Sequence, residues 1–467
     1  MENQFDLVVI GGGPGGYTAA VKAAKLGLRT ALVEERELGG TCLNRGCIPT
    51  KAMLHAGRLF RQIKEGGQFG IFTAGAEVDY GRLLEYRRDT VSRLVQGIEQ
   101  LLKANRVTIF SGKGTLFPEK KVRITADDDE MVLTAGNVLL ASGSRPRMLS
   151  LPGMGLPGVL DSDRLLALKE LPQSLAIIGG GAIGVEFAEA FSALGTKVTI
   201  LEASSRLLPG MDREISQNLR MIFRKRGVEL HTDTDLTEIQ QGEGGLTCIF
   251  QEKGQGKAVS AQYVLCAVGR VPSIDGLFGE GAVPVMENGH VAVDGTFQTS
   301  MEGVYAIGDL IGGPQLAHAA SAQGIAVVER LTGKEPSVNV DVVPRCVYVD
   351  PEIAAVGLTV DEAKERGIAA HVGKYVMGAN GKLLISRSER GFIKVVASTE
   401  TGEVLGAHLM CPRGTDMIGE LTVAVSNHLT VPQLLAAVRA HPTYNEGIGE
   451  ALEELNGGAI HAVREMR

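Results

Sequence analysis

Tryptophan is absent from this chain of 467 residues, and aromatic side chains make up only 4% of it. Clusters of basic residues are also lacking, and with a net charge of −7 nothing indicates a nonspecific attraction to nucleic acid or anionic lipid. No apolar run approaches the roughly 18 residues of a spanning helix, and no basic leader followed by an apolar stretch opens the chain. We therefore expect a cytoplasmic protein.

Cysteine is scarce, with six residues in the chain, so a disulfide-rich secreted scaffold is excluded. Only Cys42 and Cys47 lie close together in sequence. In a reducing compartment such a pair is more often catalytic or metal-binding than structural. A zinc site would need a second Cys or His pair at ligand spacing, and only His55 is near. We therefore predict no metal site.

A glycine-rich pattern occurs twice in the chain. The length and the apolar content of 44% exceed what one hydrophobic core usually organises, so several domains are expected. Each copy consists of an apolar strand, a Gly-x-Gly-x-x-Gly turn, an amphipathic stretch and a second strand that ends in an acid. The turns begin at Gly11 and Gly179, and the acids are Glu34 and Glu202.

The two copies predict two βαβ units that bind dinucleotides. The first glycine permits the tight turn, the second lets the backbone approach a pyrophosphate, and the third lets the helix pack on the strand. The helix amino terminus attracts the anion, and the acid binds ribose hydroxyls. An acid at Glu202 favours a free 2′-hydroxyl, hence NAD over NADP, and Arg206 a few residues later slightly weakens that preference.

The cysteine pair directly follows the first acid, which places it beside the first nucleotide site. A regular helix would separate Cys42 and Cys47 by about 7.5 Å along its axis, beyond the roughly 4.4–6.8 Å between Cα atoms that a disulfide tolerates. Gly46 and Pro49 can supply the irregularity that a disulfide would need.

The segment from Gly39 to Lys51 reads Gly-Gly-Thr-Cys-Leu-Asn-Arg-Gly-Cys-Ile-Pro-Thr-Lys. It closely resembles the redox motif of the pyridine nucleotide-disulfide oxidoreductases, and the resemblance covers essentially the whole chain. Further matches are Ala-Ser-Gly-Ser-Arg-Pro at 141–146, Ala-Val-Gly-Arg-Val-Pro at 267–272, Thr-Ser-Met-Glu-Gly-Val-Tyr-Ala-Ile-Gly-Asp at 299–309 and Ala-His-Pro-Thr-Tyr-Asn-Glu at 440–446.

The resemblance implies an α/β fold with two Rossmann-like dinucleotide-binding domains, one for FAD and one for NAD, and an α+β carboxyl-terminal dimerisation domain. The expected boundaries are 1–147 for the first part of the FAD domain, 148–270 for the NAD domain, 271–342 for the second part of the FAD domain and 343–467 for the interface domain. A homodimer is implied as well.

The family pattern assigns the first βαβ unit to FAD and the second to NAD. The residues that it implies for cofactor binding are Gly11, Gly13, Pro14, Gly15, Gly16, Glu34, Gly40, Thr41, Lys51, Gly114, Ala141, Ser142, Gly143, Gly179, Gly181, Gly184, Glu202, Gly269, Arg270, Gly308, Asp309, Leu316, Ala317 and His318. Asp309 matches the aspartate that binds the ribityl–phosphate part of FAD. His318 either contacts the flavin or merely packs, and Gln323 stands where the family commonly has an acid.

Catalytic roles are likewise implied by the resemblance. Cys42 would exchange with a dithiol substrate, and Cys47 would lie against the flavin and pass it two electrons. Lys51 and Glu186 match an ion pair near the flavin's reactive edge. His441 would be the base, oriented by Glu446, and in the family this pair comes from the partner subunit.

Three features favour the branch of the family that oxidises protein-bound dihydrolipoyl groups with NAD⁺. They are the amino-acid sequence of the redox motif, including Thr50 where other branches often have lysine, the lack of cysteines after Cys411, and the acid Glu202. The expected partners are lipoylated carrier domains of 2-oxoacid dehydrogenase or glycine cleavage complexes.

Two alternatives remain open. One is an NAD(P)H-dependent reductase of another small disulfide, distinguishable by its nucleotide preference. The other is a non-catalytic flavoprotein subunit whose cysteine pair is only structural, against which the complete set of matching catalytic residues argues.

Overall fold

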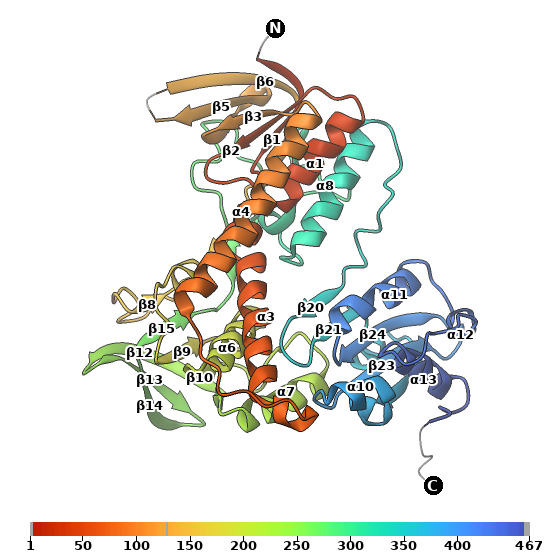
Figure 1. Ribbon diagram of the computed structural model, residues 1–467. Helices are drawn as coiled ribbons and strands as arrows, with labels where there is room; N and C mark the ends of the chain where they lie inside the picture. Colours follow the sequence, from red (N-terminus) through yellow and green to blue (C-terminus); the bar gives the residue numbers. More distant parts are fainter. Residues whose placement is uncertain (1–2, 128, 462–467) are drawn as a thin grey trace.

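A computed structural model describes residues 3–127 and 129–461, and its upper part in Figure 1 is built on a seven-stranded sheet ordered β3-β2-β1-β6-β5-β4 with β19 beside β6. Strands β1, β2, β3, β6 and β19 pair in parallel, and β4 and β5 are antiparallel additions. The bounds are β1 Gln4–Ile10, β2 Thr30–Glu34, β3 Thr108–Ser111, β4 Lys113–Phe117, β5 Lys121–Ala126, β6 Asp129–Leu140 and β19 Val304–Ala306.

Helices cover this sheet because its parallel strands are apolar on both faces. Helix α1 packs against α8, although most of the chain separates them, and the two run side by side in Figure 1. The bounds are α1 Pro14–Lys25, α2 Gly40–Arg45, α3 Cys47–Lys64, η1 Gly66–Phe69, α4 Tyr80–Ala104, η2 Pro118–Lys120, η3 Gly308–Leu310 and α8 Ala317–Leu331.

The second sheet has five strands in the order β11-β10-β9-β15-β8, all parallel. A three-stranded antiparallel meander, β12-β13-β14, adjoins it. The bounds are β8 Val159–Leu160, α5 Ser162–Leu166, β9 Ser174–Ile178, α6 Ala182–Leu194, β10 Lys197–Glu202, α7 Arg213–Lys225, β11 Glu229–Thr232, β12 Thr234–Gly242, β13 Gly245–Glu252, β14 Gln255–Ala261 and β15 Tyr263–Cys266.

Two short ribbons join these parts. Strand β7 (Ser144–Pro146) pairs with β16 (Arg270–Pro272), so the chain leaving the first sheet runs antiparallel to the chain returning from the second. Strands β17 (Met286–Glu287) and β18 (His290–Val291) form a small hairpin. Helix α3 also packs on α6 of the second unit, which places the end of the cysteine segment between the two units.

The carboxyl-terminal unit contains a five-stranded antiparallel sheet in the order β20-β21-β24-β23-β22. Its bounds are β20 Arg345–Val347, β21 Ile353–Gly357, α9 Val360–Glu365, β22 Ala370–Val376, η4 Met377–Ala379, α10 Gly381–Ser386, β23 Phe392–Ser398, β24 Val404–Met410, α11 Gly414–Ser426, α12 Val431–Leu435 and α13 Glu446–Leu455. Within the part of the chain that the structure describes, no helix is both long and apolar enough to cross a membrane.

The predicted α/β fold class is confirmed. Two βαβ sheets with helices on their faces correspond to the two glycine-rich repeats, and a separate α+β unit follows them. The domain boundaries at residues 147, 270 and 342 stay predictions.

Candidate active site

The two glycine turns have the same backbone geometry. Gly11 and Gly179 adopt φ values of 106° and 108°, which L side chains rarely adopt. A Cβ on Gly16 would lie 1.8 Å from the Gly11 carbonyl oxygen, and one on Gly184 would lie 1.9 Å from that of Gly179. The helices α1 and α6 therefore approach their strands at a distance that only glycine allows.

The predicted acids brace these turns. Glu34 accepts the Gly12 N–H at 2.6 Å and the Arg36 N–H at 2.8 Å, and Glu202 accepts the Ser204 N–H at 2.6 Å together with the Gly180 N–H. Burial raises the pKa of Glu34, although both N–H donors act in the opposite direction. Each carboxylate oxygen keeps a further lone pair, so both acids can still accept ribose hydroxyls.

Both turns fit a dinucleotide pyrophosphate. Helix α1 begins after Gly13 and α6 begins after Gly181, and neither helix has a side-chain cap on its first N–H groups. A Cβ on Gly181 would meet nothing within 4 Å, so the space before α6 is open. Uncapped N–H groups at a helix start bind anions well, and the residues present at both turns therefore fit the pyrophosphate of a dinucleotide such as FAD or NAD.

Asp309, the predicted ribityl–phosphate contact, is held by residues from both crossing strands. The Ser144 hydroxyl donates to its carboxylate, and Arg270 donates to the Ser144 hydroxyl at 2.7 Å while lying 3.8 Å from Asp309. The structure thus brings Arg270 and Asp309 together through Ser144, a residue to which the sequence had assigned no role. The neighbouring Gly308 N–H donates to the Gln323 side-chain oxygen at 2.8 Å, so a neutral amide serves there as acceptor.

Most of the remaining predicted cofactor residues lie near the first turn or the crossing strands. A Cβ on Gly40 would lie 2.7 Å from the Gly13 Cα, so α2 starts in contact with the turn and carries Thr41 there. Gly114, in β4, packs against Ile10 and Val33. Five others lie at the start of α1 or near the crossing strands: Pro14 at the start of α1, Ala141, whose N–H donates to the Ile10 carbonyl, Ser142, whose hydroxyl donates to the Ser273 carbonyl, and the positive-φ glycines Gly143 and Gly269.

Helix α8 begins at Ala317, with Leu316 as its extended N-cap. The ring of His318 lies 2.8 Å (Nε2) from the Pro344 carbonyl oxygen, in the segment that leads to the carboxyl-terminal unit. This contact gives His318 a structural partner, and a flavin contact by His318 stays a prediction. Gly15, within α1, packs on Ile307 and Ala320 of the returning chain.

The cysteine pair spans the break between α2 and α3. Gly46 lies at this break with φ −138° and ψ −110°, so the irregularity that the disulfide reach requires is present. Both cysteines are free thiols in this structure. The Cys42 thiol donates a hydrogen bond to Cys47, which together with the Lys51 charge lowers the pKa of Cys47 to about 7 despite its burial, and the same hydrogen bond raises the pKa of Cys42.

An ion pair lies beside Cys47. The Lys51 ammonium is 2.7 Å from a carboxylate oxygen of Glu186, and Glu186 is only 5% exposed. The other Glu186 oxygen accepts the Tyr348 N–H at 3.0 Å, and the Tyr348 ring lies 4.7 Å from the Lys51 nitrogen. Burial alone would lower the pKa of Lys51, but Glu186 and Cys47 outweigh it and raise that pKa.

Tyr348 is a part of this site that sequence reasoning missed. Its contribution to Glu186 comes from its main chain, which leaves no pattern in the sequence, and burial raises the pKa of its hydroxyl to about 12. Arg45, whose role the sequence left open, pairs with Glu37 at 2.6 Å and lies 3.5 Å from Asp163. These two ion pairs hold the Arg45 side chain next to α5.

The predicted base pair is formed in the carboxyl-terminal unit. His441 Nδ1 lies 2.7 Å from a Glu446 carboxylate oxygen, and the Thr443 N–H donates to the other at 2.8 Å. Burial would raise the pKa of Glu446, but the Thr443 N–H and His441 outweigh it, so that pKa is lowered. The His441 side chain is 78% exposed. Within residues 3–127 and 129–461, no hydrogen bond or ion pair joins it to the cysteines.

The chain belongs to the pyridine nucleotide-disulphide oxidoreductase family. The family model matches residues 5–324, and the model of the family's dimerisation domain matches residues 343–452. The family assignment, the flavoprotein disulfide oxidoreductase class and the cofactors FAD and NAD, all expected from the sequence, are thereby confirmed. The presence of a dimerisation domain supports a homodimer.

Several characterised relatives match almost the full chain. A dihydrolipoyl dehydrogenase of Bacillus subtilis is 39% identical over 99% of this chain and 100% of its own length, and one of Geobacillus stearothermophilus is 37% identical over 98% of each. Among solved structures, the HOCl-induced flavoprotein disulfide reductase RclA of Escherichia coli is 29% identical, with a TM-score of 0.85 over 97% of this chain and 99% of that one. LpdA of Mycobacterium tuberculosis is 27% identical, with a TM-score of 0.89 over 96% and 99%.

Proposed function

We propose that this chain is a dihydrolipoyl dehydrogenase, which oxidises protein-bound dihydrolipoyl groups with NAD⁺. The observation that carries the proposal is the Cys42 and Cys47 pair at the break between α2 and α3, next to the Lys51–Glu186 ion pair at 2.7 Å. This arrangement suits a pair that accepts electrons at one sulfur and passes them on from the other. Relatives that share the full length at 37–39% identity carry this activity in their names.

The reaction with substrate starts from the oxidised pair. A substrate thiolate attacks the Cys42 sulfur, the Cys42–Cys47 bond breaks, and Cys47 leaves as a thiolate, which its lowered pKa favours. The second substrate thiolate then attacks the first substrate sulfur, which closes the substrate disulfide and releases Cys42. Two electrons thus enter the pair, and two protons leave the substrate. FAD, when bound, supplies the two-electron relay from Cys47 to NAD⁺.

Proton removal from the substrate falls to His441. Only a thiolate is nucleophilic, so a base must accept each thiol proton. Glu446 holds the Nδ1 side of the ring, which leaves Nε2 to take the proton. Because His441 is exposed and unconnected to the cysteines of its own chain, we propose that it serves Cys42 of a second copy in a homodimer.

The proposal extends to cofactor residues, partners and location. We keep the predicted FAD and NAD contacts and the three domain boundaries as proposed assignments. Separate lipoylated carrier domains of 2-oxoacid dehydrogenase or glycine cleavage complexes would present the dithiol. The free, buried thiols of Cys248, Cys266 and Cys411 suit a reducing compartment, which supports a cytoplasmic location.

The test is substrate oxidation by the purified holoenzyme. NADH formation from dihydrolipoamide and NAD⁺ is followed, with reduction of glutathione disulfide by NADPH measured in parallel. Rapid NAD⁺-dependent oxidation with little glutathione reduction is the expected result. Robust reduction of glutathione disulfide without dihydrolipoamide oxidation would replace the proposal by the alternative, a reductase of another small disulfide.

A further inference from the structure

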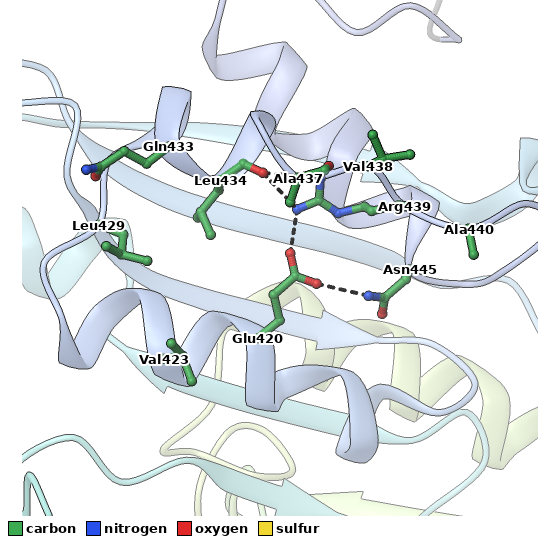
Figure 2. A pocket seen from close by; sticks show the side chains of 10 residues that line it. All are labelled: Glu420, Val423, Leu429, Gln433, Leu434, Ala437, Val438, Arg439, Ala440 and Asn445. Carbon is green, nitrogen blue, oxygen red and sulfur yellow. Dashed lines mark hydrogen bonds and ion pairs between the residues drawn. The ribbon is translucent and has the colours of Figure 1, made fainter.

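The loop that carries the base pair runs from Arg439 to Glu446, and both of its ends bond to one carboxylate. Glu420 on α11 accepts the Arg439 guanidinium at 2.5 Å with one oxygen and the Asn445 side-chain amide at 2.9 Å with the other. Figure 2 shows the three side chains meeting in this way. Arg439 lies two residues before His441, and Asn445 lies directly before Glu446.

Arg439 is well placed to transmit this attachment. Its side chain is only 10% exposed, and its guanidinium also points to the Ala437 carbonyl at 3.3 Å and to the Leu434 carbonyl of α12 at 3.5 Å. The loop therefore leaves α12 at a defined angle that depends on Glu420. Removal of Glu420 would leave a buried guanidinium without its charge partner, which is costly.

Packing gives the loop little support on this side. A cavity of about 510 Å³ opens beside Glu420, with Val423, Leu429 and Val438 among the residues that line it, and Val438 is 99% exposed. Among the residues that the structure describes, the imidazole of His441 bonds to Glu446 alone, and its side chain is 78% exposed. The polar bonds to Glu420 hold the loop ends, while the Asn380 side-chain bond to the Thr443 carbonyl at 3.0 Å and the Tyr444 hydroxyl bond to Ser386 at 2.9 Å hold its middle.

We propose that Glu420 is a positioning residue for the His441–Glu446 pair. It fixes both ends of the loop, so that the free Nε2 of His441 is presented at a constant place to the thiol that it deprotonates. This inference rests on the proposed role of His441 as the base. A misplacement of about 1 Å between reacting groups costs up to about 100-fold in rate, so the effect of losing Glu420 is measurable.

The test compares E420A and E420Q with D416N, a matched control on the same helix whose exposed carboxylate pairs only locally with Arg413. Oxidation of dihydrolipoamide is expected to fall by about 10- to 100-fold in E420A and by less in E420Q, which keeps one acceptor oxygen. The control D416N keeps its full rate. NADH oxidation by ferricyanide needs the flavin but not His441, and it is expected to stay unchanged in all three variants.

A double-mutant cycle separates positioning from a general loss of stability. In an H441Q background, E420A should cause no further loss, because the group that it positions is already gone. The role of Glu420 is overturned if the rate losses caused by E420A and H441Q are additive. It is also overturned if E420A keeps the full rate while H441Q loses it. In both cases the proposed base stands. If H441Q itself keeps the full rate, the proposed base fails and the inference fails with it. Should E420A not fold, E420Q and R439M enter the same cycle.

Discussion

Cys42 and Cys47 experience different electrostatic environments, because one donates the hydrogen bond that the other accepts and only Cys47 is strongly stabilised as a thiolate. This asymmetry decides which sulfur leaves when the substrate attacks. It depends on the Cys42 S–H as well as on the Lys51 charge, and the two causes can be separated by substitution.

Replacement of Cys42 by alanine is expected to raise the pKa of Cys47 from about 7 toward its ordinary value of 9.0, because the S–H donor is lost. The thiolate of Cys47 would then form at higher pH than in the wild type. Alkylation by iodoacetamide, followed against pH in the reduced protein and located by mass spectrometry, measures this. C42S is the control, since its hydroxyl keeps a donor, and equal midpoints in C42A and wild type would contradict the prediction.

The charges beside Cys47 should act with opposite signs. K51M removes a cation that lowers the pKa of Cys47, so that pKa rises, whereas E186Q removes an anion that raises it, so that pKa falls. The same alkylation profile measures both variants. If the pKa of Cys47 moves in the same direction in both variants, disruption of the ion pair rather than the individual charges controls that pKa.

At this scale the sequence indicated some side chains that lie together in the structure, and it did not indicate main-chain contacts. Cys42, Cys47, Lys51 and Glu186 were found because their spacing matches a known motif, and the structure brings Lys51 and Glu186 to 2.7 Å. Tyr348 was missed because it binds Glu186 through its N–H, which every residue except proline possesses. Glu420 was missed because a single acid on an amphipathic helix looks like an ordinary surface residue.

The contact between strand and helix at each glycine turn makes the two nucleotide sites separately testable. G184A would place a Cβ 1.9 Å from the Gly179 carbonyl oxygen, and α6 would have to move away from β9. We expect the KM for NAD⁺ to rise by at least about 10-fold while FAD stays bound. G16A should instead yield protein that has lost FAD. Flavin absorbance and NAD⁺ kinetics distinguish the variants, and loss of flavin in G184A alone would reverse the assignment.

Helices α1 and α8 are joined by a buried carboxylate. Glu329 lies 2.7 Å from the Lys22 ammonium and accepts the Ser337 N–H at 2.7 Å. Burial opposes ionisation, but these partners outweigh it and lower the pKa of Glu329 to about 2, from an ordinary 4.5. The stabilisation is therefore complete above about pH 4.5 and is lost as pH falls toward 2.

E329Q is expected to lower the free energy of unfolding by about 1–3 kcal/mol at pH 7. The difference from wild type should shrink as pH falls from about 4.5 toward 2, because Glu329 of the unfolded chain takes up a proton in this range while Glu329 of the folded chain is still ionised. Urea unfolding midpoints at several pH values measure this effect. Glu335→Gln, in the exposed segment after α8, is the control, and a difference that stays constant down to pH 4 would contradict the prediction.

Elements were predictable where periodicity or spacing constrained them. The alternation of strand, turn and helix identified α1, α6 and their flanking strands, and the reach of a disulfide required the break that Gly46 provides between α2 and α3. The α+β class of the carboxyl-terminal unit came from the family resemblance, and its five-stranded antiparallel sheet was not predicted, since its strands carry no repeat. The cross-strand ribbon of β7 and β16 joins residues too distant in sequence for a local pattern to reveal.

The whole molecule is expected to work only as a dimer, and mixed dimers test this. C47S and H441Q homodimers should each be inactive in dihydrolipoamide oxidation. A heterodimer of the two, isolated with two different affinity tags, should regain about half of the wild-type rate, because one of its two sites combines intact cysteines with an intact partner histidine. An inactive heterodimer would place the cysteines and His441 of each site in the same chain.

Glu34 and Glu202 close two turns of equal geometry, and this duplication has an evolutionary consequence. If the proposed cofactor contacts hold, the adenosine half that FAD and NAD⁺ share meets the same backbone arrangement at both turns, yet each copy is encoded separately. Substitutions around Glu202 are then expected to change the preference for one pyridine nucleotide over another and to leave the retention of flavin at the first turn unchanged. This independence would allow the same fold to change its soluble electron acceptor while it keeps its bound flavin.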